Sequence, residues 1–453
     1  MTYRMRGRRS AALAAAAAAC AAWLAVTPAA RAGEPAATEP AATASAATAS
    51  SATESAAESA VTDPAPAAGP LTASARFYVD PDNGAARQAV VDAAADDQEN
   101  AANMRALAGL PQAAWFTGGT PAEVRADAAG LVAAAKATGQ VPVAVAYNVP
   151  GRDCGLYSSG GAASSAAYRA WIAALAEGIG DGPAVVVLEP DGLAALPKDC
   201  AGSVDPDGTR TAERLADLGF AVSTLKARPG TAVYLDAGNS KWKSVGDIAQ
   251  RLIDAGAARA DGFALNVSNF QPTGQSNQYG TWVAKCVWFA TEGPDWARGH
   301  TDWCADQYYS SAAPNDGRPG NAVLAEDPTT WHWTDAWYDR SVGSPSTDEL
   351  LHFVVDTSRN GLGPWQPAPG AYTDPETWCN PPGRGMGERP TAATGVPLVD
   401  AYLYVKTIGE SDGSCTRGTG GTVDPVYGIV DPPAGAWWPD LAHTLARNAR
   451  PAL

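Results

Sequence analysis

The fold of this chain is decided by one stretch, Ala184-Val185-Val186-Val187-Leu188-Glu189-Pro190-Asp191. Its apolar residues are mostly β-branched, and a run of this kind is typical of a strand buried on both faces of a parallel sheet. Pro190 has no N–H to donate to a ladder, so the strand must end before it. We therefore expect Asp191 at the rim of a sheet, where parallel α/β proteins place their functional residues. The alternative is an aspartate that only caps the following helix.

The same unit, a short apolar strand that ends on polar residues and leads into a helix, recurs along the chain. We expect further strands at residues 75–80, 113–117, 141–148, 232–235, 262–267, 352–355 and 398–405, and helices at 121–138, 168–179, 211–227 and 245–257. Parallel strands joined by crossover helices form a barrel or a doubly wound sheet, with all functional ends on one face. Between about 270 and 348 the rhythm breaks down, which predicts a long irregular insertion that serves as a lid or binding wall.

The chain divides into three expected parts. Residues 1–32 combine an arginine-rich start with an apolar stretch and an A-x-A pattern that ends at Ala32, as in a secretion signal. Residues 33–74 are rich in Ala, Thr, Ser and Pro and predict a disordered linker. Residues 75–453 are expected to form one domain, because no second linker follows. These features predict a secreted, extracellular protein.

Charge and cysteine content exclude several classes of partner. The net charge is −16 and the pI about 4.7, which argues against nucleic acid and anionic membranes as partners and suits a neutral substrate. We expect a monomer. After the signal segment six cysteines remain, and an even number in a secreted chain predicts three disulfides. None has C-x-x-C spacing and the chain has only 4 histidines, so we expect no metal site.

Four carboxylates are candidates for meeting in one cleft: Asp153, Asp191, Asp236 and Asp412. An aspartate has an ordinary pKa of about 3.9, so it can donate a proton near neutral pH only where its pKa is raised. A second carboxylate nearby has this effect, because like charges disfavour joint ionisation. We therefore predict a cleft in which one of these carboxyl groups is kept protonated.

Several motifs together resemble glycoside hydrolase family 6, the cellulases. They are Tyr147-Asn148-Val149-Pro150-Gly151-Arg152-Asp153-Cys154-Gly155 with Ser158-Ser159-Gly160-Gly161, then Leu188-Glu189-Pro190-Asp191, Leu235-Asp236-Ala237-Gly238, Asn266-Val267-Ser268-Asn269, Trp378-Cys379, and Lys406 with Glu410-Ser411-Asp412. They cover residues 76–453 in the family's order. With this resemblance we expect a distorted (β/α) barrel of mainly parallel strands with long active-site loops.

The resemblance implies a role for each matching residue. Asp191 would be the general acid, Asp153 would raise its pKa and help to shuttle protons, and Asp412 would be the disputed base. Tyr147 would press on the sugar ring that distorts, and Ser159 would help to hold the nucleophilic water. The substrate-binding residues would be Trp115, Asp236, Trp242, Asn266, Asn269, Trp378, Lys406 and Glu410. No cofactor is implied, because acid, base and water suffice.

The resemblance also implies how the cysteines pair. It joins Cys154 to Cys200 and Cys379 to Cys415, which leaves Cys286 and Cys304 as a third pair.

Some interpretations remain open at this point. Arg152 and Asp153 could form a plain salt bridge, Trp115 and Trp242 could be core residues, and Asp236 could orient loops rather than touch sugar. Asp356 and Arg359 are expected to form an ion pair under the site. Asn239 stands where the family usually has histidine, so this position is given no proton-transfer role because asparagine does not titrate.

The resemblance implies hydrolysis of cellulose or cello-oligosaccharides with inversion at the anomeric centre. Two long aromatic stretches, 286–341 and 361–380, are expected to roof the site, and the expected activity is therefore that of a cellobiohydrolase acting from the non-reducing end. The alternatives are an endo-β-1,4-glucanase, a hydrolase of another β-glucan, and a non-catalytic glucan-binding protein.

Overall fold

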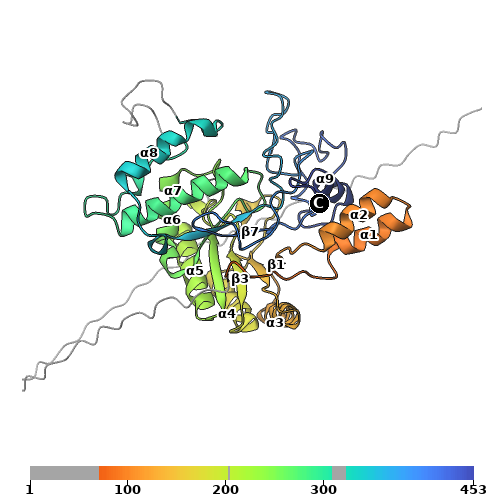
Figure 1. The fold of residues 1–453 in the computed structure, drawn as a ribbon, viewed down its shortest axis with the longest axis horizontal. Helices are drawn as coiled ribbons and strands as arrows, with labels where there is room; N and C mark the ends of the chain where they lie inside the picture. The colour runs from red at the N-terminus through yellow and green to blue at the C-terminus, as the bar shows by residue number, and fades with distance from the viewer. Residues whose placement is uncertain (1–70, 203–204, 309–322) are drawn as a thin grey trace, which may run out of the picture. The chain divides into compact units, whose positions relative to one another are not determined.

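The computed structural model describes residues 71–202, 205–308 and 323–453 (Figure 1). The expected signal, residues 1–32, and all but the end of the expected linker lie outside these residues. Among the helices of the described part, none is both long and apolar enough to cross a membrane.

One sheet of seven parallel strands forms the centre of the fold. The strands are β1 (Ala114–Phe116), β2 (Val143–Ala146), β3 (Ala184–Leu188), β4 (Thr231–Asp236), β5 (Gly262–Leu265), β6 (His352–Asp356) and β7 (Val399–Leu403). Their spatial order is the order of the sequence. The order never reverses, so the sheet is not doubly wound but curls as an open barrel. The backbone N–H of Ala113 donates to the carbonyl of Tyr404 at 2.9 Å and joins the two edges. The expected distorted barrel is confirmed.

The apolar run of β3 is explained by burial on both faces. Val185 and Val187 point into the cluster inside the curl, whereas Val186 and Leu188 belong to the larger core between sheet and helices. Alternate residues of a strand point to opposite faces, so neither face leaves room for a polar residue.

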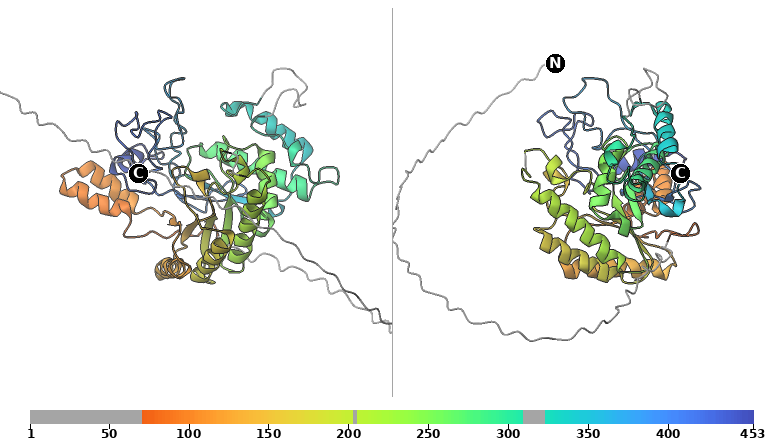
Figure 2. Two further views of the ribbon diagram at one scale, coloured as in Figure 1. Left: turned by 180° about the vertical axis from the view of Figure 1, so that it is seen from behind. Right: turned by 90° about the vertical axis from the view of Figure 1, so that its left-hand side faces the viewer.

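The helices α3 (Pro121–Ala137), α4 (Ser165–Ile179), α5 (Thr209–Lys226), α6 (Val245–Asp254) and α7 (Thr273–Thr291) cover the outside of the sheet (Figure 1). A separate core joins α1 (Gly84–Ala94) and α2 (Gln98–Ala108) to α9 (Pro439–Arg447), and Figure 2 shows these segments side by side. Local sequence signals set where the helices begin, as at α3. Thr120 is the N-cap of α3 and forms a capping box with Glu123, and Pro121 occupies the first turn.

Two sequence-based predictions of secondary structure are wrong. The strand expected at 75–80 is only a single bridge between Phe77 and Val141. The insertion expected to be irregular contains the 19-residue helix α7 and the helix α8 (His332–Ser341). In α7 the buried positions Tyr279, Trp282, Val283 and Cys286 follow helical spacing. The abundance of Trp and Gly obscured this period.

The structure contains the three expected disulfides, Cys154–Cys200, Cys286–Cys304 and Cys379–Cys415. The first joins the loop after β2 to the loop after β3. The second fastens the short turn Thr301–Trp303 to α7, and both its cysteines are buried in the core beside the helices.

Two buried charged side chains connect the same two loops. Glu189 accepts hydrogen bonds from the N–H of Asn148, at 2.8 Å, and of Val149, at 3.1 Å. Arg214, on α5, donates to the carbonyls of Pro150, at 2.7 Å, and Gly192, at 3.2 Å. The ends of β2 and β3 are therefore joined by a carboxylate, a guanidinium and a disulfide.

Replacing Arg214 by Met should lower the free energy of unfolding by about 3 kcal/mol, because two buried carbonyls lose a charged donor and Glu189 loses a nearby positive charge. The matched control is Arg228→Met, which removes an exposed pair with Asp181 at 3.6 Å and should cost less than about 1 kcal/mol. Urea unfolding followed by circular dichroism measures both. Equal losses in the two variants would show that Arg214 does not fasten the loops.

Candidate active site

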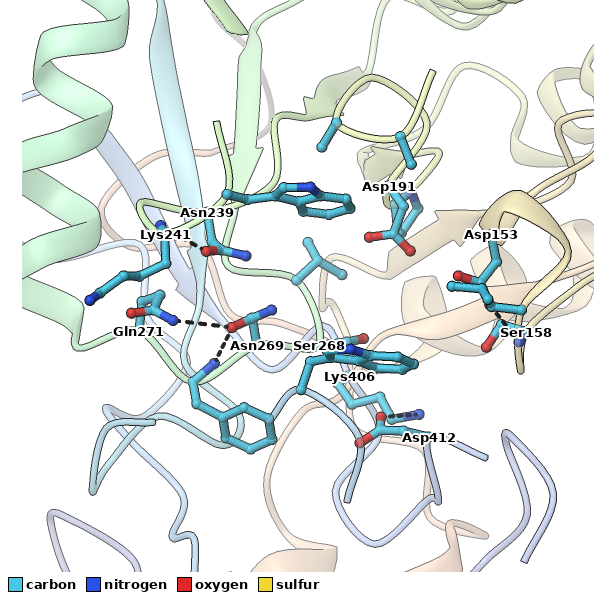
Figure 3. Close-up of a pocket in the computed structure, with 18 of the residues that line it drawn as sticks. Asp153, Ser158, Asp191, Asn239, Lys241, Ser268, Asn269, Gln271, Lys406 and Asp412 are labelled. Atoms are coloured by element: carbon cyan, nitrogen blue, oxygen red, sulfur yellow. Dashed lines mark hydrogen bonds and ion pairs between the residues drawn. The ribbon is translucent and has the colours of Figure 1, made fainter. Parts of the chain in front are cut away.

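A cavity of about 490 Å³ lies at the carboxyl ends of the strands (Figure 3). Parallel strands bring their following loops to this one edge, so residues distant in sequence meet there. The predicted site residues that line it are Trp115, Tyr147, Asp153, Asp191, Trp242, Asn269, Trp378, Lys406 and Asp412. Figure 3 shows Asp153, Asp191 and Asp412 around the same hollow.

Four predicted residues do not line this cavity: Ser159, Asp236, Asn266 and Glu410. Ser159 is exposed on the loop after β2, and its neighbour Ser158 lines the cavity instead. Glu410 is half-buried and forms a backbone bridge with Trp437. Asp236 and Asn266 are buried beneath the loops.

Asp236 and Asn266 both bind backbone close to the cavity. The carboxylate of Asp236 accepts from the N–H of Asp191 at 2.9 Å, so it holds the loop after β3. The Asn266 side chain donates to the carbonyl of Asp356 at 2.9 Å and accepts from the N–H of Gln271 at 2.9 Å. Both therefore orient loops, which for Asp236 is the alternative that the sequence left open.

The carboxyl group of Asp191 is kept neutral by its surroundings. Its pKa is raised to about 7: burial is the largest cause, the negative charges of Asp153 and Asp412 contribute, and the hydrogen bond from the Tyr147 hydroxyl opposes the rise. Asp191 also has a φ of 66°, a conformation that non-glycine residues seldom adopt and that concentrates at functional sites. The loop after β3 thus holds a proton donor against the cavity.

Asp153 lies on the loop after β2 and lines the same cavity. Burial raises its pKa, while a hydrogen bond from the Ser158 N–H, at 2.7 Å, and the charge of Arg152 lower it. Arg152 donates to the carbonyls of Thr117 and Tyr147, each at 2.6 Å, and to that of Ser158. No salt bridge joins it to Asp153 among the described residues, so this arginine fixes the loop instead.

Asp412 has the opposite electrostatic surroundings from Asp191. Burial would raise its pKa, but Arg359 and Lys406 hold it below its usual value. Arg359 donates to one carboxylate oxygen at 2.7 Å and the Lys406 ammonium lies 3.6 Å from the other. Asp412 is therefore ionised, whereas Asp191, which lines the same cavity, keeps its proton up to about pH 7.

The expected ion pair between Asp356 and Arg359 is wrong. Arg359 pairs with Asp412, and Asp356 instead accepts from the backbone N–H groups of Ser268, Ser358, Val405 and Lys406. These N–H groups belong to the ends of three neighbouring strands. Asp356 thus holds in place the two loops whose residues Ser268 and Lys406 line the cavity.

The aromatic residues differ in how freely they face the cavity. Trp242 and Trp378 are 41% and 38% exposed, so their rings are open to a ligand. Trp115 packs partly on the inner core, donates its indole N–H to the carbonyl of Val405 at 2.8 Å, and lies edge-on to Tyr147 with ring centroids 5.5 Å apart. It is both a core and a cavity residue.

Sequence reasoning missed polar residues that also line the cavity: Ser158, Asp199, Lys241 and Gln271. Each lies within a few residues of a quoted motif or a cysteine, which is the signal that could have found them. Asn239 lines the cavity as well, and its side-chain oxygen accepts from the backbone N–H of Lys241 at 3.0 Å.

One group of possible metal ligands occurs in the described part of the chain, formed by Cys415, Asp424 and Asp431. Cys415 is in a disulfide and Arg417 pairs with Asp424 at 2.7 Å. A sulfur without a thiolate and a site that already holds a guanidinium do not fit a metal centre.

The arrangement can therefore perform acid–base chemistry. It combines a protonated carboxyl group, a second carboxyl beside it, an ionised carboxylate, and open indole rings that suit flat apolar ligand faces.

Comparison with known proteins agrees with this chemistry. The family described as Glycosyl hydrolases family 6 matches residues 72–449. Endoglucanase A of Cellulomonas fimi is 33% identical over 375 residues, which are 83% of this chain and 61% of that protein. Probable 1,4-beta-D-glucan cellobiohydrolase C of Aspergillus fumigatus is 30% identical over 343 residues, 70% of this chain and 64% of that protein. The chain thus spans less than two thirds of the length of these two relatives.

A solved structure is also similar. It is the endoglucanase Cel6 of Mycobacterium tuberculosis in complex with methyl-cellobiosyl-4-deoxy-4-thio-beta-D-cellobioside, with a TM-score of 0.59 and 35% identity, and the match covers 84% of this chain and 98% of that one. The family match extends over nearly all of the folded residues, and this chain therefore belongs to glycosyl hydrolases family 6.

Proposed function

We propose that this protein hydrolyses the β-1,4-glucosidic bonds of cellulose or cello-oligosaccharides with inversion of the anomeric centre. The observation that carries the proposal is the contrast between a neutral Asp191 and an ionised Asp412 at one cavity. Inverting hydrolysis needs an acid that protonates the leaving oxygen and a carboxylate that activates water on the opposite side of the ring.

Asp191 is the proposed acid and Asp412 the proposed base, which acts directly or through water. Asp153 keeps Asp191 protonated through its negative charge and relays protons. In the proposed complex Tyr147 presses on the distorted sugar ring, and Ser159 reaches the nucleophilic water when its loop moves.

The sugar-binding residues are proposed from their places in the cavity. Trp115, Trp242 and Trp378 stack on pyranose faces, and Lys406 and Asn269 bind hydroxyl groups. Glu410 acts on Lys406 through its charge but lies outside the cavity, and Asp236 and Asn266 lie beneath the loops. We therefore assign these three residues to support of the binding residues. We also propose a secreted monomer, with residues 1–32 as its signal and 33–74 as its linker.

For the mode of cleavage we propose internal attack, and exo action from the non-reducing end remains the competing candidate. The sequence predicted a roof of two stretches, and among the described residues it is 361–380 that contributes lining residues: Pro364, Thr377 and Trp378. Of the described residues within 286–341, none lines the cavity. Two of the similar proteins are also named endoglucanases.

Replacing Asp191 by Asn should lower kcat on a soluble cello-oligosaccharide about 10²- to 10⁴-fold, because the amide cannot protonate the leaving oxygen. Substrate binding, measured by calorimetry, should remain. The control is Asp306→Asn, which neutralises another aspartate of raised pKa that does not line the cavity. Proton NMR of the first products of the parent should show the α-anomer. Binding without hydrolysis in the parent itself would instead indicate a glucan-binding protein.

Activity should fall as the pH rises through about 7, because Asp191 loses its proton there. Burial is the main cause of the raised pKa, and the charge of Asp153 adds to it. In Asp153→Asn this charge is gone, so the pKa of Asp191 falls and the alkaline limb of kcat/KM should move to lower pH. An alkaline limb that stays in place would mean that Asp153 does not set this pKa.

The mode of cleavage can be read from the fall in viscosity of a soluble substituted cellulose per reducing end formed. Internal cleavage shortens the chains at once, so we expect a rapid fall. A viscosity that barely changes while cellobiose accumulates would establish exo action. A parallel assay on mixed-linkage β-glucan tests whether another glucan is preferred.

A further inference from the structure

Asn380 lies behind Asp412 and outside the cavity, and it holds this carboxylate from two sides. Its backbone N–H donates to a carboxylate oxygen of Asp412 at 2.9 Å, and its side-chain oxygen accepts from the Asp412 N–H at 2.7 Å. Asn380 is fully buried. Any rotation of its side chain would therefore disturb the backbone that carries Asp412.

The amide of Asn380 is oriented by acceptors on its nitrogen. This nitrogen donates to a carboxylate oxygen of Asp431 at 2.9 Å, to the carbonyl of Gly413 at 2.9 Å and to the Ser411 hydroxyl at 3.0 Å. A flipped amide would place its oxygen against these acceptors, so the orientation is fixed.

Asp431 belongs to a buried pair of acids that the acid–base chemistry of the cavity does not use. Asp431 is 1% exposed and Asp424 fully buried, and oxygens of the two carboxyl groups lie within 4.8 Å of each other. The other oxygen of Asp431 is buried and has no donor among the described residues. An extra proton on Asp431 would give this oxygen a partner in Asp424.

The charges around this pair of carboxyl groups stabilise only one of the two in its ionised form. Arg417 is fully buried and binds Asp424 at 2.7 Å. Other charged or titratable groups near the pair in the described part of the chain are Tyr427, whose hydroxyl donates to the Asn380 carbonyl, Asp412, and Glu376, whose carboxylate accepts from the Arg417 backbone N–H at 2.6 Å. The pKa of Asp431 is raised to about 7: burial is the largest cause, Asp424 adds to the rise, and the hydrogen bond from Asn380 and the charge of Arg417 oppose it.

We propose that Asn380 is a positioning residue for Asp412, and that Asp431 holds the Asn380 amide as a neutral carboxylic acid that donates its proton to Asp424. Arg417, Asp424, Asp431 and Asn380 then form one buried network that ends at the proposed base. Neither Asn380 nor Asp431 touches the substrate, so their effect on hydrolysis passes through the position of Asp412.

The two substitutions Asp431→Asn and Asp431→Ala separate the parts of this proposal. Asparagine has the shape of the neutral acid and keeps both an acceptor for Asn380 and a donor for Asp424. It should leave kcat within about two-fold of the parent's. Alanine removes both groups and should lower kcat about ten- to a hundred-fold with little change in KM, because a displaced catalytic group loses rate rather than binding. The control is Asp440→Asn, on the exposed first turn of α9.

Stability gives a second measurement that does not need activity. Between the unfolded pKa of an aspartate, about 3.9, and the raised pKa in the fold, the unfolded chain releases the proton first, so rising pH favours unfolding. The Tm of the parent should therefore fall between about pH 4 and pH 8 relative to that of Asp431→Asn, in which this proton is absent. Asp440→Asn should follow the parent.

An Asp431→Asn variant as damaged as Asp431→Ala would overturn the neutral acid, because it would show that a carboxylate is required. An Asp431→Ala variant with the kinetics of the parent would overturn the positioning of Asp412. The kinetic measurement rests on the proposed function, whereas the dependence of Tm on pH does not. If the parent releases no sugar, the Tm comparison still decides whether Asp431 holds a proton.

Discussion

The structure depends on a close approach of two strand ends that electrostatics alone would oppose. The loops after β2 and β3 each carry an aspartate into the cavity, and two negative charges in a buried site repel each other. Glu189, Arg214 and the Cys154–Cys200 disulfide hold these loops together from behind. Because the scaffold prevents separation, this repulsion adds to the effect of burial, and together they raise the pKa of Asp191 to about 7.

Neighbouring charges also explain the protonation state of Asp412, but here they are positive and lower the pKa. Asp412 is buried, yet two cations lie beside it and hold it ionised. Burial raises the pKa of both groups, and the charges beside each group decide the outcome: the negative charge of Asp153 adds to the rise at Asp191, whereas Arg359 and Lys406 reverse it at Asp412. Pairs of carboxyl groups whose pKa values are driven apart are what acid–base hydrolysis requires. The buried pair Asp424 and Asp431 shows the same contrast behind the cavity. Arg417 binds Asp424 and favours its ionised form, whereas the pKa of Asp431 is raised.

Much of the fold follows from local sequence, since short apolar runs that end on polar residues predicted all seven strands of the sheet. The errors have physical causes. The stretch 75–80 has strand composition, but no neighbouring strand extends far enough to pair with it beyond Phe77. In α7 tryptophans and glycines concealed a helical period. Arg359 was assigned to the wrong aspartate, because sequence proximity favoured Asp356 while the curl of the sheet brings Asp412 to the guanidinium.

The sequence by itself determined the parallel strand–helix repeat, the position of each candidate carboxylate at a strand end, and the motifs that the family shares. It could do so because strand period and motif spacing are local properties of a chain. Only the tertiary structure decided which of these residues face the cavity, and that Asp236 and Asn266 lie beneath it. The protonation states of Asp191 and Asp412 were likewise decided by the tertiary structure, because a pKa is set by burial and by charges that the chain brings together from distant segments.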